Sequence, residues 1–314
     1  MNIAILGTGQ FALAIAHLLD INDSKYTIVG RDVDQLNDLK VNKTNSKYSN
    51  YVFKNSLKTE LISQSNFFKY DLIFYCLPSK NINYLTNIFD KNNQVPIVFT
   101  SKGFKNKFIF EHFTNYVILS GGSYSVEILK NIPCYITLAS TNMKLIKKVH
   151  LILESKQCLI SINQHPKSIE LLGIFKNIIA IFCGIITQLN LGKNIESAFI
   201  SKILNNMNQI IDFDKTTLVE PAGIGDLFLS CSSIKSRNYS FGINLVKNHS
   251  DINLVKNHSD IKSNKLVEGY DSLTNMKLSK NIKILNDLYS IIENIKLNKI
   301  DYTKELIINI IHKY

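Results

Sequence analysis

The stretch Gly7-Thr8-Gly9-Gln10-Phe11-Ala12 lies directly after an apolar run at residues 3–6 and opens a helical pattern that continues to about Leu19. Between a strand and a helix, such glycines allow a tight turn and let a pyrophosphate approach the backbone amides at the helix N-terminus. Ala12 replaces the third glycine, which the pattern tolerates. A turn of this kind after the first strand indicates a dinucleotide-binding domain.

Short apolar runs alternate with helical patterns through the first half of the chain, as far as about Asn163. Continuous apolar strands separated by helices are typical of a mainly parallel sheet that is covered on both faces. We therefore predict an α/β fold with a doubly wound, mainly parallel, Rossmann-like N-terminal domain. The expected strands lie at residues 3–6, 26–29, 72–77, 95–99, 117–119, 135–138 and 159–162.

The strand patterns stop after Pro166, and long helical patterns replace them. This change predicts an all-α C-terminal domain, with the dinucleotide-binding domain at residues 1–165 and a helical substrate-binding and catalytic domain at 166–314. The clearest helical patterns cover residues 168–189, 195–213, 282–295 and 302–312. Residues 243–251 are repeated without change at 252–260, which we interpret as a duplicated surface segment without chemistry.

Composition excludes several other classes of protein. The chain of 314 residues is 45% hydrophobic and 19% charged, which is typical of a globular protein that folds alone or as a simple oligomer, a homodimer included. Its net charge of +11 comes from scattered lysines without an arginine-rich block, so we expect no nucleic-acid partner but some steering of anionic ligands. The five cysteines and seven histidines show no metal-binding spacing, so no metal is expected.

The N-terminus and the hydrophobic runs bear on location. Met1 leads straight into the first strand, which leaves no room for a signal peptide. The longest apolar run, residues 178–186, is far shorter than the ~20 residues that span a bilayer. We therefore expect a cytoplasmic protein that is not inserted in a membrane.

The end of the second expected strand bears on the cofactor. An NAD-selective domain usually has a carboxylate there for the ribose hydroxyls, whereas Arg31 offers a guanidinium to the 2′-phosphate of NADPH. Asp32 keeps NADH open as the alternative. Lys102 follows a later strand, so the topology places it near the same edge of the sheet.

Lys176 interrupts an otherwise apolar helical pattern, and a buried lysine is costly unless it is paired or functional. It is therefore a candidate proton donor and acceptor. Gly173, Asn177, Ala180 and Gly184 recur at helical spacing and form a narrow face for a ligand or for another backbone.

Two polar motifs follow in the second half. The segment 223–227 holds Asp226 between glycines and a helical pattern, and Ser236-Arg237-Asn238 opens a helix. A hydroxyl, a guanidinium and an amide at a helix N-terminus suit a phosphate group. Taken one at a time, Ser236 is equally well explained as a helix cap and Arg237 as a surface charge.

Seven motifs occur in order along the chain: Gly7-Thr8-Gly9, Ser101-Lys102-Gly103, Leu119-Ser120-Gly121-Gly122-Ser123-Tyr124, the segments 173–177, 223–227 and 236–242, and Val267-Glu268-Gly269. This ordered set closely resembles the NAD(P)-dependent glycerol-3-phosphate dehydrogenase family of bacterial type, over residues 2 to about 278. The resemblance implies reversible reduction of dihydroxyacetone phosphate to sn-glycerol 3-phosphate with NADPH or NADH, which feeds glycerophospholipid synthesis.

The resemblance also implies roles for individual residues. The catalytic residues would be Lys176, Lys102 and Asp226. The substrate would be bound by Lys102, Gly121, Ser123, Lys176, Asn177, Asp226, Ser236, Arg237 and Asn238. The cofactor would be bound by Gly7, Gly9, Gln10, Phe11, Arg31, Lys102, Ser125, Arg237 and Glu268.

The chain departs from the family pattern at two places. Gly122 stands where the family usually has proline, and Glu220-Pro221 stands where it usually has Gly-Leu. These departures, and the duplicated segment between Arg237 and Glu268, bear on the catalytic rate more than on the substrate. Two rival functions remain open: a ketopantoate-type or other small hydroxyacid reductase, and a non-catalytic dinucleotide sensor.

Overall fold

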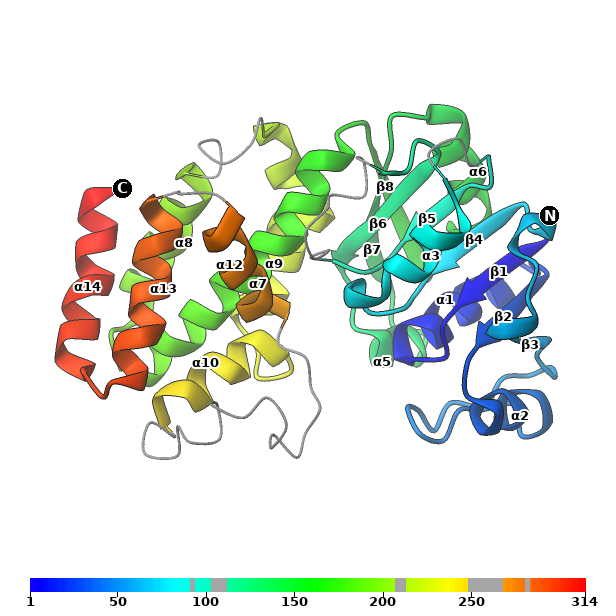
Figure 1. Cartoon of the computed structure of the whole chain (residues 1–314), viewed down its shortest axis with the longest axis horizontal. Helices are drawn as coiled ribbons and strands as arrows, with labels where there is room; N and C mark the ends of the chain where they lie inside the picture. The colour runs from blue at the N-terminus through cyan, green and yellow to red at the C-terminus, as the bar shows by residue number, and fades with distance from the viewer. Residues whose placement is uncertain (91–93, 103–111, 207–212, 248–267, 280–282) are drawn as a thin grey trace. The chain divides into compact units, whose positions relative to one another are not determined.

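The computed structural model describes residues 1–90, 94–102, 112–206, 213–247, 268–279 and 283–314 (Figure 1). The chain forms two compact units. The first comprises residues 1–170 together with 216–225, and the second comprises residues 171–215 together with 226–314.

The first unit is built on one sheet of eight strands in the order β3-β2-β1-β4-β5-β6-β7-β8. The strands from β1 to β6 run parallel to one another, β7 pairs antiparallel with β6, and β8 pairs parallel with β7. This mainly parallel order confirms the predicted doubly wound sheet. The strands are β1 (Ile3–Leu6), β2 (Tyr26–Gly30), β3 (Thr59–Leu61), β4 (Leu72–Tyr75), β5 (Ile97–Phe99), β6 (Tyr116–Gly122), β7 (Cys134–Ala139) and β8 (Cys158–Asn163).

The central strands are apolar throughout because helices and loops cover both faces of the sheet. Every residue of β1, β4 and β5 is buried. Continuous burial of this kind stabilises the sheet by about 25 cal/mol for each Å² of apolar surface removed from water. The helices of this unit are α1 (Gln10–Ile21), α2 (Val33–Val41), α3 (Asn83–Ile88), α5 (Ser125–Ile128) and α6 (Met143–Leu153).

The described residues of the second unit form helices joined by short connections, with no strand among them, which confirms the predicted all-α domain. Its longest helix, α7, is long and apolar enough to cross a membrane by length and composition, yet 94% of its most apolar window is buried inside the fold. Figure 1 shows α13 and α14 side by side at the C-terminus. The helices are α7 (Pro166–Gln188), α8 (Lys193–Asn206), α9 (Asp226–Cys231), α10 (Arg237–Lys247), α12 (Glu268–Ser279), α13 (Lys283–Lys296) and α14 (Ile300–Lys313).

Two glycines let α7 and α10 cross with their backbones in contact. A Cβ added to Gly242 would lie 1.9 Å from the carbonyl oxygen of Ile181, and one added to Gly184 would lie 2.1 Å from that of Tyr239. Neither carbonyl can move without breaking its helix, so only glycine fits at either position. The narrow face expected on α7 thus serves, at Gly184, to seat another backbone.

The structure differs from the sequence expectations in three respects. It adds the short strand β3, which no apolar run marked. Its two compact units divide at residues 170 and 171, five residues after the expected boundary at 165 and 166. Residues 216–225 also return to the first unit, as the short helical turns 215–219 and 221–225. The second copy of the duplicated segment lies outside the described residues.

Candidate functional site

The glycine-rich turn after β1 has the geometry that a pyrophosphate requires. Gly7 has a φ of +127°, and an added Cβ would lie 3.1 Å from the carbonyl oxygen of Cys76, so this position needs glycine for the turn itself. Gly9 differs, because a Cβ added there would meet no atom within 4 Å. The amides that begin α1 have no side-chain cap. Open space before an uncapped helix N-terminus fits a dinucleotide phosphate.

Polar side chains hold this turn against α2 and the loop that follows it. Thr8 Oγ1 donates to Gln35 Oε1 over 2.7 Å, and Asn45 Nδ2 donates to the carbonyl oxygen of Thr8 over 2.8 Å. Gln10 Nε2 donates to the carbonyl oxygen of Tyr48 over 2.9 Å. Gln10 is exposed and Phe11 is half-buried, so both side chains lie at the surface beside the turn. The network holds the start of α1 in a fixed position.

At the end of β2, Arg31 is exposed and Asp32 is the N-cap of α2. The Asp32 carboxylate accepts from the backbone amide of Gln35 over 3.2 Å, and this bond is the main reason that the pKa of Asp32 is lowered. Lys47 Nζ lies 4.0 Å from the same carboxylate. Because the Asp32 carboxylate already caps a helix, a ribose bound at the end of β2 would face mainly the cations Arg31 and Lys47.

The other N-terminal candidates follow β5 and β6, whose carboxyl ends lie at the same edge of the sheet as those of β1 and β2. Lys102 comes three residues after β5, and Ser125 begins α5. Ser123 Oγ donates to the carbonyl oxygen of Gly121 over 3.4 Å. Gly121 has a φ of +145°, and its added Cβ would lie 2.9 Å from the Cα of Ile136, so pairing of β6 with β7 already requires this glycine.

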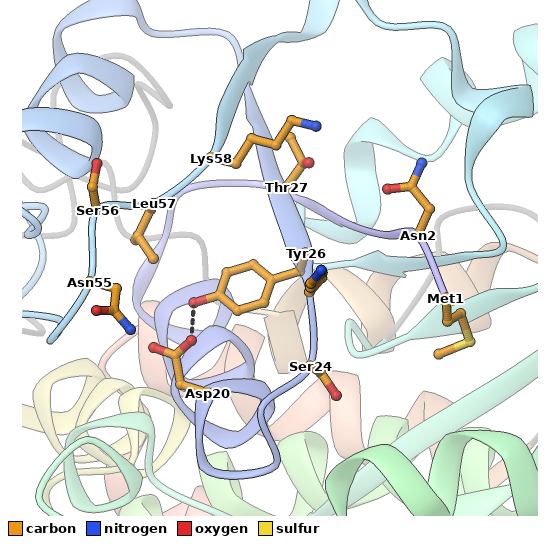
Figure 2. A pocket seen from close by; sticks show the side chains of 11 residues that line it. Met1, Asn2, Asp20, Ser24, Tyr26, Thr27, Asn55, Ser56, Leu57 and Lys58 are labelled. Atoms are coloured by element: carbon orange, nitrogen blue, oxygen red, sulfur yellow. Dashed lines mark hydrogen bonds between the residues drawn. The ribbon is translucent and has the colours of Figure 1, made fainter.

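A pocket of about 610 Å³ lies elsewhere in the first unit, beside the amino ends of β1 and β2 (Figure 2). Its wall includes Tyr26, whose hydroxyl donates to Asp20 over 2.9 Å, and burial raises the pKa of that carboxyl. The residues that line the pocket include none of the predicted site residues. In sheets of this kind ligands bind at the carboxyl ends of the strands, so we do not assign the pocket to the dinucleotide.

In the second unit, α7 and α9 bring together a buried ion pair. Lys176 Nζ donates to Asp226 Oδ1 over 2.6 Å and to Ser230 Oγ over 3.1 Å. The side chain of Lys176 is 13% exposed and that of Asp226 is 5% exposed. Water screens such a pair poorly, so its hydrogen bonds fix the ammonium group in one place. A fixed, nearly buried ammonium is suited to donate a proton to a substrate oxygen.

The start of α12 packs against the same turn of α7. A Cβ added to Gly269 would lie 2.5 Å from the carbonyl oxygen of Asn177, which is itself buried. The amide of Gly269 donates to Asn238 Oδ1 over 3.0 Å, so Asn238 caps this helix from α10. The side chain of Glu268, which was predicted to contact the cofactor, lies outside the part of the chain that the structure describes.

The predicted phosphate motif opens α10, as expected. Ser236 is buried and its Oγ accepts from the amide of Tyr239 over 3.4 Å, which gives it the role of N-cap. Arg237 is the first residue of the helix and is exposed. The structure therefore supplies structural roles for Ser236 and Asn238, while their contacts with substrate remain predictions.

Sequence reasoning missed Ser230 as a second partner of Lys176. A signal was present, because Ser230 lies four residues after Asp226 and hence on the same face of α9. Nothing in the sequence indicates that Glu220 binds side chains of β8, because that strand lies about sixty residues earlier in the chain.

A dinucleotide turn at the edge of a doubly wound sheet, followed by a helical unit with a buried lysine–aspartate pair, defines a two-domain nicotinamide-dependent dehydrogenase. Residues 2–146 match the NAD-dependent glycerol-3-phosphate dehydrogenase N-terminus, and residues 166–302 match the C-terminus of the same family. The chain belongs to the NAD-dependent glycerol-3-phosphate dehydrogenase family.

Individual relatives agree with this assignment. A glycerol-3-phosphate dehydrogenase [NAD(P)+] of Ehrlichia ruminantium (strain Welgevonden) is 31% identical over 329 residues, which cover 95% of this chain and 98% of the relative. The crystal structure of glycerol-3-phosphate dehydrogenase from Coxiella burnetii shares the fold, with a TM-score of 0.78 and 24% identity over 98% of each chain. A probable 2-dehydropantoate 2-reductase from Bacillus subtilis is less similar, with a TM-score of 0.56 and 12% identity over 94% of this chain and 100% of its own.

Proposed function

We propose that this protein interconverts dihydroxyacetone phosphate and sn-glycerol 3-phosphate, and so supplies glycerol 3-phosphate for glycerophospholipid synthesis. Family membership supports the substrate pair. The observation that carries the chemistry is the pair formed by Lys176 and Asp226, 2.6 Å apart and nearly buried. Carbonyl reduction needs one proton donor held at the substrate oxygen, and this pair provides it.

The N-terminal residues fit a nicotinamide dinucleotide. Its pyrophosphate would lie over Gly9 at the start of α1, where an added Cβ meets nothing within 4 Å. Gln10 and Phe11 would border it, with Ser125 and Lys102 nearer the nicotinamide. When bound, the reduced cofactor supplies the hydride for the ketone carbon.

Lys176 moves the proton. In the direction of reduction, its ammonium group donates a hydrogen bond to the ketone oxygen and gives up a proton as the alcohol forms. Asp226 and Ser230 hold Nζ in place, because both lie within hydrogen-bond distance of it. In oxidation, the neutral amine accepts the hydroxyl proton, and the same two partners orient it. Lys102 would assist as a second cation near the substrate.

The substrate phosphate would be bound at the start of α10. Arg237 offers a planar guanidinium fork, and the first amides of the helix point in the same direction as its N-terminal dipole. Gly121, Ser123, Asn177, Ser236 and Asn238 complete the predicted set. The amide group of Asn238 can donate through Nδ2 while Oδ1 accepts from Gly269.

NADPH is the preferred cofactor in this proposal, with NADH as the alternative. Arg31 and Lys47 both lie near the end of β2, and the carboxylate of Asp32 already caps α2. Two cations and an engaged carboxylate favour a 2′-phosphate over a free hydroxyl.

The rival functions have less support. A ketopantoate-type reductase has no need of a phosphate motif at the start of α10, and a non-catalytic sensor has no need of a buried lysine on α7. The proposal places the enzyme in the cytoplasm, acting on a small phosphorylated molecule without nucleic acid or membrane insertion. A homodimer stays a prediction, which light scattering on the purified protein would test.

The deciding experiment is an NADPH oxidation assay with three ketones in parallel. We expect turnover with dihydroxyacetone phosphate, very little with dihydroxyacetone, which lacks the phosphate, and none with ketopantoate. Turnover with ketopantoate alone would overturn the assignment. Equal rates with the phosphorylated and unphosphorylated ketones would remove the phosphate site from the proposal.

A further inference from the structure

Glu220 lies in the segment 216–225, which leaves the helical unit and packs on the sheet. The turn 221–225 that follows it contacts β6 and β7, and the amide of Ala222 donates to Thr137 Oγ1 of β7 over 3.1 Å. The same turn packs closely on the preceding turn 215–219, since a Cβ added to Gly223 would lie 2.4 Å from the carbonyl oxygen of Leu218. Asp226 is the next residue in the chain after this turn, and it begins α9.

The carboxylate of Glu220 binds two side chains of β8. One oxygen accepts from Ser161 Oγ, and the other accepts from Asn163 Nδ2 over 3.0 Å. Residues 161 and 163 lie two apart on a strand, so both side chains point from the same face of the sheet. Hydrogen bonds to an ionised carboxylate are about twice as strong as those between neutral groups. Glu220 is therefore a firm attachment between the turn and the sheet.

Asn163 carries this attachment on to α7. Its Oδ1 accepts from the amide of His165 over 2.7 Å, one residue before α7 begins at Pro166. A single asparagine thus binds Glu220 with one end of its amide and the root of α7 with the other. The two segments joined in this way are those that lead, ten and six residues later, to Lys176 and Asp226.

We propose that Glu220 is a positioning residue for the Lys176–Asp226 pair, acting through Ser161 and Asn163. The inference rests on the proposed function, because it assigns Glu220 to the same reaction. Reaction rates fall steeply when a catalytic group moves by about 1 Å, so loosening either attachment lowers the rate of the chemical step. In the proposed function, cofactor binding depends on the carboxyl ends of β1 and β2, near Gly9, so the affinity for the cofactor should stay unchanged.

Replacement of Glu220 tests the proposal. Glu220→Ala removes both acceptors, and we expect kcat to fall about tenfold while the KM for NADPH stays within about twofold of the parent value. Glu220→Gln keeps one acceptor but turns an amide donor toward the other partner, so its kcat should lie between those of the parent and Glu220→Ala. Glu305→Ala on α14 removes an exposed carboxylate and is the matched control, with unchanged kcat.

A double-mutant comparison separates positioning from general loss of structure. Ser161→Ala should lower kcat in the parent but have little further effect in Glu220→Ala, because the hydrogen bond is already lost. Equal effects of Ser161→Ala in both backgrounds would overturn the proposal. So would a Glu220→Ala enzyme with parental kcat, or one in which kcat and the KM for NADPH change together with the melting temperature.

A second measurement does not depend on the substrate. Amide hydrogen exchange across residues 221–231 should be faster in Glu220→Ala than in the parent, and unchanged in Glu305→Ala. If the parent fails to reduce dihydroxyacetone phosphate, the proposed function fails while faster exchange still supports the attachment. If exchange is unchanged, the positioning role of Glu220 is wrong whatever the substrate is.

Discussion

Lys176 has two hydrogen-bond partners on α9, and they differ in charge. Asp226 accepts a charge-assisted hydrogen bond from Nζ over 2.6 Å, whereas the neutral hydroxyl of Ser230 accepts one over 3.1 Å. In the proposed reaction, a lysine held in this way would keep its position after releasing its proton. This is the property that a reversible reaction requires of its acid–base group.

Lys176→Met should abolish catalysis and weaken the fold together. We expect kcat to fall by at least ~100-fold, the lower range for a positioned acid–base group. Stability should fall by ~3–5 kcal/mol, because the buried Asp226 loses its partner. In the double variant Lys176→Met/Asp226→Leu, urea unfolding should show most of the stability restored while turnover stays absent. A single variant with activity within a few fold of the parent would remove Lys176 from the mechanism.

His17 makes stability depend on pH without taking part in the reaction. It is 5% exposed, its Nε2 lies 2.9 Å from Asn131 Oδ1, and the hydroxyl of Tyr51 lies 2.8 Å from its Nδ1. These partners suit a neutral ring with its proton on Nε2. Burial is the main cause that lowers the pKa of His17 below its usual 6.5.

The sign of the effect follows from proton uptake. Below about pH 6.5 the unfolded chain binds a proton at His17 that the folded protein resists, so stability falls as pH falls, by at most about 1.4 kcal/mol per pH unit. Above that pH the contribution is fully present. His17→Gln keeps a donor and an acceptor but does not titrate. Between pH 7.5 and about 5, the free energy of unfolding in urea should therefore decline more in the parent than in His17→Gln. Parallel declines in the two proteins would contradict the assignment.

At the scale of elements, the turn between β1 and α1 separates structural from functional glycine. Gly7→Ala places a side chain at a φ of +127° beside the carbonyl of Cys76, and should cost ~1–3 kcal/mol of stability. Gly9→Ala meets open space, so stability should change by less than ~0.5 kcal/mol. Its Kd for NADPH should nevertheless rise at least tenfold, as measured by fluorescence titration. Parental affinity in Gly9→Ala would place the pyrophosphate elsewhere.

The elements also show what sequence patterns can and cannot predict. Seven strands were predicted because each is an apolar run, whereas β3 (Thr59–Leu61) has one apolar residue among its three. The cap of α2 was predictable in retrospect, since Asp32 is followed three residues later by Gln35. The return of 216–225 to the sheet was not, because polar contacts with distant strands hold it.

The candidate site was predicted unevenly for the same reason. The glycine turn and the Lys–Asp pair stand out because each violates a local rule. The glycine turn leads into a helix without a capping side chain, and Lys176 places a charge in an apolar helix. Gly121 and Asn238 carried no such mark. Their structural roles depend on a neighbouring strand and a neighbouring helix, and only the folded chain reveals them.

At the scale of the whole molecule, charge is matched to both ligands. The chain carries a net charge of +11, and both the dinucleotide and a phosphorylated ketone are anions. Long-range attraction of this kind raises association rates and is screened by salt, with a Debye length of about 10 Å at 0.1 M. The proposed chemistry at Lys176 would be screened far less, because its side chain is 13% exposed and is paired with Asp226.

Raising the ionic strength from about 0.02 M to about 0.2 M should therefore slow NADPH association several-fold while leaving kcat within about twofold, since screening acts on encounter and not on the buried pair. Stopped-flow fluorescence measures the first quantity and steady-state turnover the second. NADH, which lacks the 2′-phosphate, is the matched ligand and should show a shallower dependence on salt. Arg31→Ala should bring the NADPH slope toward that of NADH, because it removes the cation proposed to bind that phosphate. If the association rates of both cofactors with the parent depended equally on ionic strength, the 2′-phosphate would have no part in the encounter. If kcat fell in parallel with the association rate, salt would act on the folded enzyme and not on the approach of its ligands.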